Sequence, residues 1–271
     1  MAIAEIIAIG NELLLGDVLD TNTHWLCHQL TGLGAHVRRA TMVRDDPEAI
    51  GEVLTGALAR APDLLLTCGG LGPTADDLTL SAIATALNRP LTLHPQAEEM
   101  LRATYLRLAA RGLVLDAVLT DARRKMAYLP QGAEPLHNPV GAAPGVLLRL
   151  GQTALICLPG VPEEMKGIFT SSLAPFLQER LGQAAFRERA LTVNCGDESQ
   201  IAPVVDAVAR HHPTVYIKSR ARPYGEGVQL LVTLSLAGTE ERDVEAALDA
   251  AEQELTRRLS EAGVAVVERR I

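Results

Sequence analysis

The chain has 271 residues, 48% of them hydrophobic and 21% charged, a composition typical of a globular protein and not of a disordered one. Its formal net charge is −8 and its basic residues are scattered, which argues against direct binding of nucleic acid, because contacts to many phosphates need a positive field. The four cysteines form no Cys-x-x-Cys pair and no apolar stretch reaches about 18 residues, so we expect a cytoplasmic protein without a signal peptide or membrane span.

The first part of the chain alternates short apolar runs with amphipathic segments. Residues 4–10 form a β-branched run that ends at a glycine, and residues 63–70 repeat this pattern, which predicts buried strands of a parallel sheet. Helices are expected around 20–33, from 47 with an apolar stripe through Leu58, from near 77 to 87 and from 95 to about 111, with a further strand over 36–43. This order predicts an α/β fold with a doubly wound, mostly parallel sheet.

Residues 123–144 are rich in proline and glycine and are expected to form loops. A hairpin follows, with strands over 145–150 and 153–158 joined by Gly151 and Gln152, and Pro162 opens another helix. After residue 182 the pattern is strand, helix, two strands, helix and strand, which predicts a second, smaller α+β domain of split-βαβ or KH-like type. The predicted domains are therefore residues 1–182 and 183–271.

The strongest local pattern is the glycine-rich segment 69–79, GGLGPTADDLT, which follows an apolar strand and precedes a helix. In open α/β sheets ligands bind at the carboxyl ends of the strands. Gly69, Gly70 and Gly72 permit close approach of the backbone and leave N–H groups for an anion, and Thr74 adds a hydroxyl donor. The pattern predicts a phosphate or pyrophosphate site, with a plain strand-to-helix turn as the alternative.

Two adjacent acids, Asp76 and Asp77, follow these glycines. Their charges would repel a phosphate unless they hold a divalent metal ion or cap the following helix. Glu12 and Asp20 follow the first strand and are expected at the same edge of the sheet, although such acids are commonly solvated loop residues or caps. The candidate metal ligands are therefore Asp76, Asp77, Glu12 and Asp20.

Two further segments are expected to converge on this edge. Residues 138–145 contain too much glycine and proline for regular structure, and residues 158–165 combine a strand end, a glycine turn and a helix start. For the second segment, a turn whose acids complement the helix dipole is an equal alternative. The candidate substrate-binding residues in these segments are Asn138, Gly141, Pro159, Gly160 and Glu163.

Four ordered motifs, GNELLLG…DTN (10–22), GGLGPTADDLT, NPVGAAPG and LPGVPEEM, resemble the amino-terminal region of the competence/damage-inducible CinA proteins. That region belongs to the molybdopterin-binding superfamily, and the trailing domain resembles the KH-type module that follows it in CinA. Longer members carry a carboxy-terminal nicotinamide mononucleotide deamidase domain, which this chain lacks, so deamidase activity is not expected. Residues 224–227, YGEG, lie between strands and not between helices, which argues against RNA binding.

The resemblance implies a metal-dependent pyrophosphatase that hydrolyses ADP-ribose to AMP and ribose 5-phosphate; related domains fused to FAD synthases act on FAD. It implies a divalent ion (Mg, Co or Mn), with potassium as a further candidate, and a homodimer. In this scheme Asp76 or Asp77 holds the ion, with Glu12 or Asp20, and the ion polarises a phosphoryl oxygen and activates water. Lys166 or Lys218 offsets the developing charge, and Lys166 is the candidate that we assign.

Two other functions remain open from the sequence. The same glycine loop would serve a protein that binds or adenylylates molybdopterin, because a pterin phosphate needs a similar set of N–H donors. A non-catalytic adaptor in DNA uptake or repair is a third hypothesis, and the acidic composition counts against direct contact with DNA.

Overall fold

The structure, a computed structural model, describes residues 2–182, 185–220, 229–238 and 240–270. The chain divides into two compact units, residues 1–30 with 35–181, and residues 31–34 with 182–271. None of the helices in these described residues is long and apolar enough to cross a membrane.

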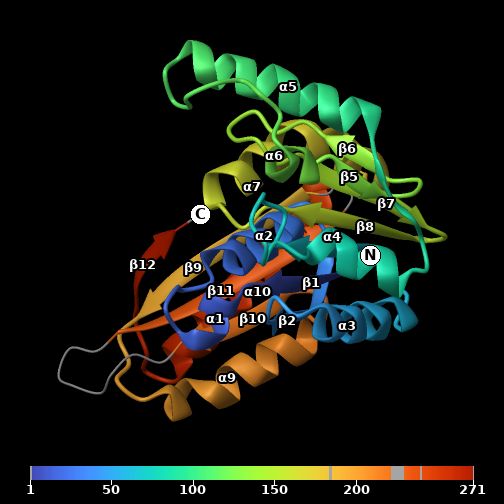
Figure 1. The fold of residues 1–271 in the computed structure, drawn as a ribbon. Helices are drawn as coiled ribbons and strands as arrows, with labels where there is room; N and C mark the ends of the chain where they lie inside the picture. Colours follow the sequence, from blue (N-terminus) through green and yellow to red (C-terminus); the bar gives the residue numbers. More distant parts are fainter. Residues whose placement is uncertain (1, 183–184, 221–228, 239, 271) are drawn as a thin grey trace. The chain divides into compact units, whose positions relative to one another are not determined.

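The first unit is built on a six-stranded sheet in the order β2-β1-β3-β8-β7-β6 (Figure 1). Its strands are β1 (Ile3–Ile9), β2 (His36–Val43), β3 (Leu64–Cys68), β6 (Glu134–Leu136), β7 (Gly145–Leu150) and β8 (Thr153–Leu158). The first four strands in this order are parallel, whereas β7 is antiparallel to both β8 and β6. The predicted doubly wound, mostly parallel α/β sheet is confirmed.

Helices cover the sheet because β3 and β8 are buried along their whole length and need cover on both faces. The helices of this unit are α1 (Asn11–Leu15), α2 (Thr21–Gly32), α3 (Pro47–Ala59), α4 (Thr79–Ala86), α5 (Pro95–Ala110), α6 (Asp121–Lys125), α7 (Pro162–Ile168), the π-helical turn η1 (Phe169–Leu173) and α8 (Ala174–Leu181). On one face, Ile7, Leu65 and Leu155 pack in one core with residues of α3, α4 and α5. Figure 1 shows α3 and α4 side by side.

The segment 123–144 is more regular than its composition predicts. It contains the end of α6, the strand β5 (Tyr128–Pro130) and the strand β6, and β5 pairs antiparallel with β4 (Leu91–Leu93). Strands of three residues are too short to show an alternating pattern, and α6 begins because the Thr120 hydroxyl accepts from the amide N–H of Arg123. The prediction of a loop-rich segment holds for the residues between these elements, but it missed the two short strands.

The second unit has the element order β9 (Ala185–Val193), α9 (Glu198–His211), β10 (Tyr216–Arg220), β11 (Leu230–Gly238), α10 (Glu241–Glu261) and β12 (Val266–Arg270). Its strands form an antiparallel sheet in the order β10-β11-β9-β12. Buried side chains of α10, such as Leu248 and Leu255, pack against buried strand residues such as Val232. The smaller α+β domain is confirmed, whereas its KH-like type stays a prediction, and the predicted Tyr224–Gly227 segment lies outside the described residues.

Candidate functional site

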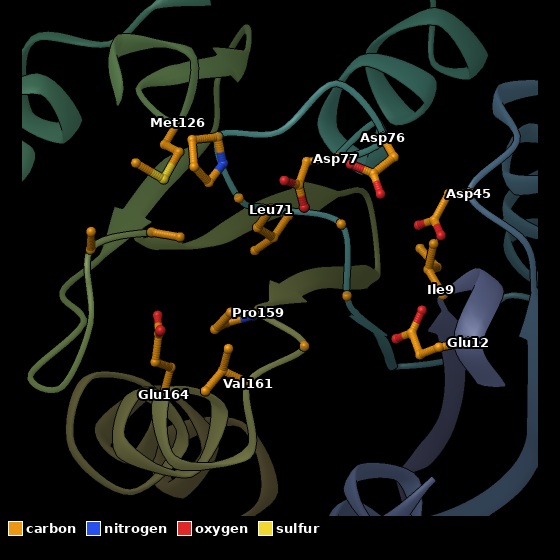
Figure 2. Close-up of a pocket in the computed structure, with 18 of the residues that line it drawn as sticks. Ile9, Glu12, Asp45, Leu71, Asp76, Asp77, Met126, Pro159, Val161 and Glu164 are labelled. Atoms are coloured by element: carbon orange, nitrogen blue, oxygen red, sulfur yellow. The ribbon is translucent and has the colours of Figure 1, made fainter. Parts of the chain in front are cut away.

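The carboxyl ends of β1, β3 and β8 surround a cavity of about 490 Å³ (Figure 2). Its wall includes the glycine loop after β3, the segment from Pro159 to Val161 after β8, and residues of α1, α5 and α7. A cleft at this edge is the usual place for a ligand in an open α/β sheet. The cavity is therefore the candidate active site.

Gly69 lets two strand ends meet at the floor of this cavity. Its N–H donates to the carbonyl oxygen of Leu158 at 2.9 Å, and its φ is +118°. A Cβ at this position would lie 2.0 Å from the carbonyl oxygen of Ile9. No residue with a side chain fits between these strand ends, which accounts for the glycine that the sequence analysis singled out.

Gly70 and Gly72 give the loop a backbone conformation in which several N–H groups remain free to bind an anion. Gly70 has a φ of +66°, and a Cβ there would lie 2.3 Å from the hydroxyl oxygen of Thr79. Gly70, Leu71 and Gly72 line the cavity, and their N–H groups donate to no other group in the part of the chain that the structure describes. Three consecutive free amides at the wall of a cavity suit the oxygens of a phosphate.

Thr74 was expected to offer its hydroxyl to a phosphate, but in the structure this hydroxyl contacts the two aspartates of the loop. Its hydroxyl oxygen lies 2.5 Å from Oδ1 of Asp76 and from Oδ2 of Asp77, and its amide donates to Asp77 Oδ2 at 2.8 Å. The Thr74 hydrogen bond is the main cause that lowers the pKa of Asp76. The helix α4 begins at Thr79, two residues after Asp77, whose carboxylate accepts from the Thr74 amide and hydroxyl.

Four carboxylates surround one end of the cavity. Glu12, Asp76 and Asp77 were expected there, and Asp45, which follows β2, joins them. Figure 2 shows these side chains grouped on one side of the open space. Burial raises the pKa of Asp45, a hydrogen bond from the Asn11 amide (2.7 Å) lowers it, and the negative charges of Glu12, Asp76 and Asp77 raise it further.

These carboxylates do not form a complete metal cage. Across residues 2–182, 185–220, 229–238 and 240–270, no three His, Cys, Asp or Glu side chains are close enough to hold an ion together. Burial is the main cause of the raised pKa of Asp45, and the negative charges of Glu12, Asp76 and Asp77 add to it. The residues fit an ion of the Mg²⁺ type, which proteins bind through one or two carboxylates together with the phosphates of a substrate.

Asp20 lies outside the main cavity and lines a smaller one of about 80 Å³, beside Glu12 and Asn22. Its Oδ1 accepts from the amide of Thr23 at 2.8 Å in the first turn of α2. The Asn22 side chain donates to the carbonyl oxygen of Gly160 at 2.7 Å and thereby positions the loop after β8. Asp20 thus acts as a local cap in this structure, which was the alternative that the sequence left open.

The predicted segment 138–145 meets α7 at Glu164. The Asn138 side-chain amide donates to Glu164 Oε2 at 2.6 Å and to the carbonyl oxygen of Ala143 at 2.8 Å. Gly141 lies against the same carboxylate, so close that a Cβ would come within 2.0 Å of its Cδ. Burial raises the pKa of Glu164, and the Asn138 hydrogen bond lowers it.

The acid in the cavity is Glu164 and not its neighbour Glu163. Glu163 is 75% exposed and pairs with Lys166 at 3.5 Å, and neither residue lines the cavity. A different lysine, Lys125 of α6, donates to the carbonyl oxygen of Thr74 and lowers the pKa of Asp76 through its charge, after the Thr74 hydrogen bond. Lys218 belongs to β10 of the second unit.

Asp45 and Glu164 are the acids of the cavity that the sequence analysis did not single out. The signal for Asp45 was its position directly after the edge strand β2, where the other strands also carry their polar residues. Lys125 belongs to the basic run 123–125, and such a run is more often a solvated surface than a contact to phosphate.

Comparisons with known proteins agree with this architecture. Residues 5–179 match the family described as a probable molybdopterin binding domain. A protein of Aeropyrum pernix is 47% identical over 216 residues, which cover 80% of this chain and 78% of that protein, and a protein of Pyrococcus abyssi is 41% identical, covering 84% and 89%. The crystal structure of CinA from Thermoplasma acidophilum, described as having unknown function, superposes with a TM-score of 0.58 at 36% identity, covering 65% of this chain and 98% of that one.

Proposed function

The chain belongs to the family of probable molybdopterin binding domains, and we propose that its cavity is the site of a metal-dependent pyrophosphatase. The substrate would be ADP-ribose or a related dinucleotide such as FAD, and the products AMP and a phosphorylated partner. This proposal goes beyond the family description and rests on the resemblance to CinA and on the chemistry of the cavity.

The observation that carries the proposal is the combination of free amides and carboxylates in one cavity. The N–H groups of Gly70, Leu71 and Gly72 suit phosphate oxygens, yet Asp76 and Asp77 follow in the same loop. Two unit charges at contact distance interact by about 1 kcal/mol even in water. A phosphate therefore binds well beside these acids only when a cation lies between them, and that arrangement is the one used to transfer phosphoryl groups.

In the proposed mechanism, one or two of the carboxylates of Asp76, Asp77 and Glu12, together with the substrate phosphates, would hold a divalent ion, which would supply Lewis-acid polarisation of a phosphoryl oxygen. The amides of Gly70 to Gly72 bind the phosphate oxygens and orient the anhydride. The carboxylate of Asp45, whose pKa is raised, accepts a proton from the attacking water.

Binding of molybdopterin without hydrolysis is the second candidate. The match to the family over residues 5–179 favours it, because that range contains every residue that lines the cavity. A pterin phosphate would use the same amides of the glycine loop. The two candidates differ in whether a phosphoric anhydride is cleaved.

A substrate screen tests the proposal. The full chain is incubated with ADP-ribose, FAD, NAD and molybdopterin, each with Mg²⁺, Co²⁺, Mn²⁺ or a chelator, with and without potassium. The proposal predicts release of AMP from ADP-ribose or FAD only with a divalent ion. Binding of molybdopterin without cleavage of any dinucleotide would favour the second candidate.

A further inference from the structure

We propose that Glu164 selects a ligand whose ring carries an amino group, by accepting a hydrogen bond from that group at the end of the cavity away from Asp45. This inference deepens the proposed function and rests on it in one respect, that a nucleotide or pterin occupies this cavity. It assigns a specificity-determining role to a residue that the phosphate chemistry does not use.

The orientation of the Asn138 amide fixes Glu164 as an acceptor. The Oδ1 atom of Asn138 accepts from the amides of Val140 (3.0 Å) and Gly141 (2.8 Å), so its nitrogen must be the atom that faces Glu164. That nitrogen donates to Glu164 Oε2 and to Ala143, and Asn138 itself is buried. Because the amide cannot rotate without losing these bonds, it presents a donor to Glu164 and holds the carboxylate in place.

One oxygen of Glu164 is left without a donor. Oε2 is the atom that accepts from Asn138, whereas Oε1 accepts from no described residue, and no described Lys or Arg pairs with this carboxylate. Figure 2 shows the carboxylate directed into the open space, across the cavity from Glu12 and Asp45. A half-buried acceptor that faces a cavity is therefore ready for a donor from a ligand.

The surroundings of Glu164 favour a flat ring over a phosphate or a sugar. Pro159 and Val161 lie beside Glu164 (Figure 2), and Met126, Ala143 and Tyr105 add further apolar surface to the cavity. A negative charge without a cationic partner repels phosphate, whereas an apolar wall with one acceptor is typical of a pocket for a heterocycle. An amino group on such a ring supplies the missing donor, and both adenine and a pterin carry one.

Matched ligands test this assignment. Isothermal titration calorimetry on the full chain with Mg²⁺ compares AMP with purine riboside 5′-monophosphate, and pterin with pteridin-4-one; in the second member of each pair a hydrogen atom replaces the amino group. We expect the amino member of one pair to bind about tenfold to a hundredfold more tightly, because the analogue without the amino group leaves the carboxylate without that donor. The pair that shows the preference identifies the source of the ring, adenine or pterin.

The variant Glu164→Gln sharpens the test. The preference should vanish, because Asn138 Nδ2 would hold the oxygen of the new glutamine and leave its NH₂ group, which cannot accept, facing the ligand; Glu179→Gln on the exposed surface of α8 should keep the preference. Equal affinities for both members of each pair in the parent chain would overturn the inference, as would a preference that survives in Glu164→Gln. A chain that hydrolyses ADP-ribose but shows no preference contradicts this inference alone, whereas binding of no member of either pair contradicts both.

Discussion

The hydroxyl of Thr79 donates a 2.8 Å hydrogen bond to the carbonyl oxygen of Gly69, ten residues earlier in the chain. Thr79 is buried in the first turn of α4, and its amide donates to the carbonyl oxygen of Gly70 at 3.2 Å. These two bonds close the glycine loop on the helix that follows it. The loop is therefore fixed before a ligand binds, which lowers the entropic cost of binding an anion.

Gly70→Val should abolish nucleotide binding while the fold is largely retained. The new side chain would meet the Thr79 hydroxyl oxygen at about the 2.3 Å expected for its Cβ, and the φ of +66° disfavours any residue but glycine. Gly151→Val is the matched control, because Gly151 has a φ of +61° in a hairpin turn with nothing within 4 Å. Calorimetry measures the affinity for the nucleotide, and circular dichroism measures whether the fold is retained. Unchanged affinity in Gly70→Val would show that the loop does not bind the nucleotide.

Asp45→Asn should raise the unfolding temperature in the absence of metal. Burial raises the pKa of Asp45, so the folded chain binds this proton more tightly than the unfolded chain, and ionisation destabilises the fold as pH rises above the ordinary value of 3.8. The difference between parent and variant should therefore be small in acid, appear as pH rises and persist at neutral pH. Saturating Mg²⁺ should reduce the difference in unfolding temperature between the parent chain and the variant. Differential scanning calorimetry checks this, and a variant less stable than the parent at pH 7 would contradict it.

Glu254→Gln should loosen the contact between α9 and α10. Glu254 accepts from His211 (2.8 Å), His212 (2.9 Å) and Arg258 (2.7 Å), and these hydrogen bonds, that of His211 first, lower its pKa from 4.5 to about 2. A depressed pKa stabilises the fold above pH 4.5, and this contribution is lost as pH falls toward 2.

Hydrogen exchange of the α9 amides measures this effect. Protection should fall in Glu254→Gln at pH 6 and match the parent near pH 2. Asp206→Asn, which changes an exposed acid of α9 that pairs with no described residue, is the control. Equal protection of α9 in parent and Glu254→Gln at pH 6 would show that the cluster does not hold the two helices together.

Glu5→Gln should destabilise the first unit by about 2–3 kcal/mol. Glu5 is only 2% exposed and pairs with Arg38 and Arg60 at 2.7 and 2.6 Å. Removing one partner of a buried pair commonly costs about 3–5 kcal/mol, and we expect less because each arginine side chain is 33% exposed. Glu134→Gln, whose pair with Arg149 is 55% exposed on both sides, should cost about 0–1 kcal/mol in the same urea titration. Equal losses in the free energy of unfolding of Glu5→Gln and Glu134→Gln would contradict the prediction.

The sequence predicted the sheet well because long apolar runs such as 63–70 have few alternatives to a buried parallel strand. It did not predict the ion pairs of Glu5, because Arg38 meets that residue only after β1 and β2 pair, and Arg60, at the end of α3, only after that helix packs against β1. The glycine loop could also be predicted, because its glycines, Thr74 and the two aspartates all lie within one continuous segment of the sequence.

The remaining parts of the cavity depend on contacts between distant segments. Glu163 and Glu164 are equivalent in the sequence, and only the rotation of α7 against Asn138 decides which one faces the cavity. Asp45 joins Asp76 through the parallel order of β2, β1 and β3, which brings three strand ends to one edge. Such choices are set by tertiary packing and leave little trace in local patterns.

The most direct test of the central proposal measures hydrolysis of ADP-ribose by the parent chain, Asp76→Asn and Asp77→Asn, with a divalent ion and with a chelator. Asp206→Asn serves as the control for the loss of one acidic charge. We predict that AMP is released only with the ion and that the rate falls sharply in at least one of the two loop variants, while nucleotide binding without metal stays equal or becomes slightly tighter because a repulsive charge has gone. Hydrolysis at the parent rate in both loop variants, or activity that the chelator leaves unchanged, would contradict the metal-dependent mechanism.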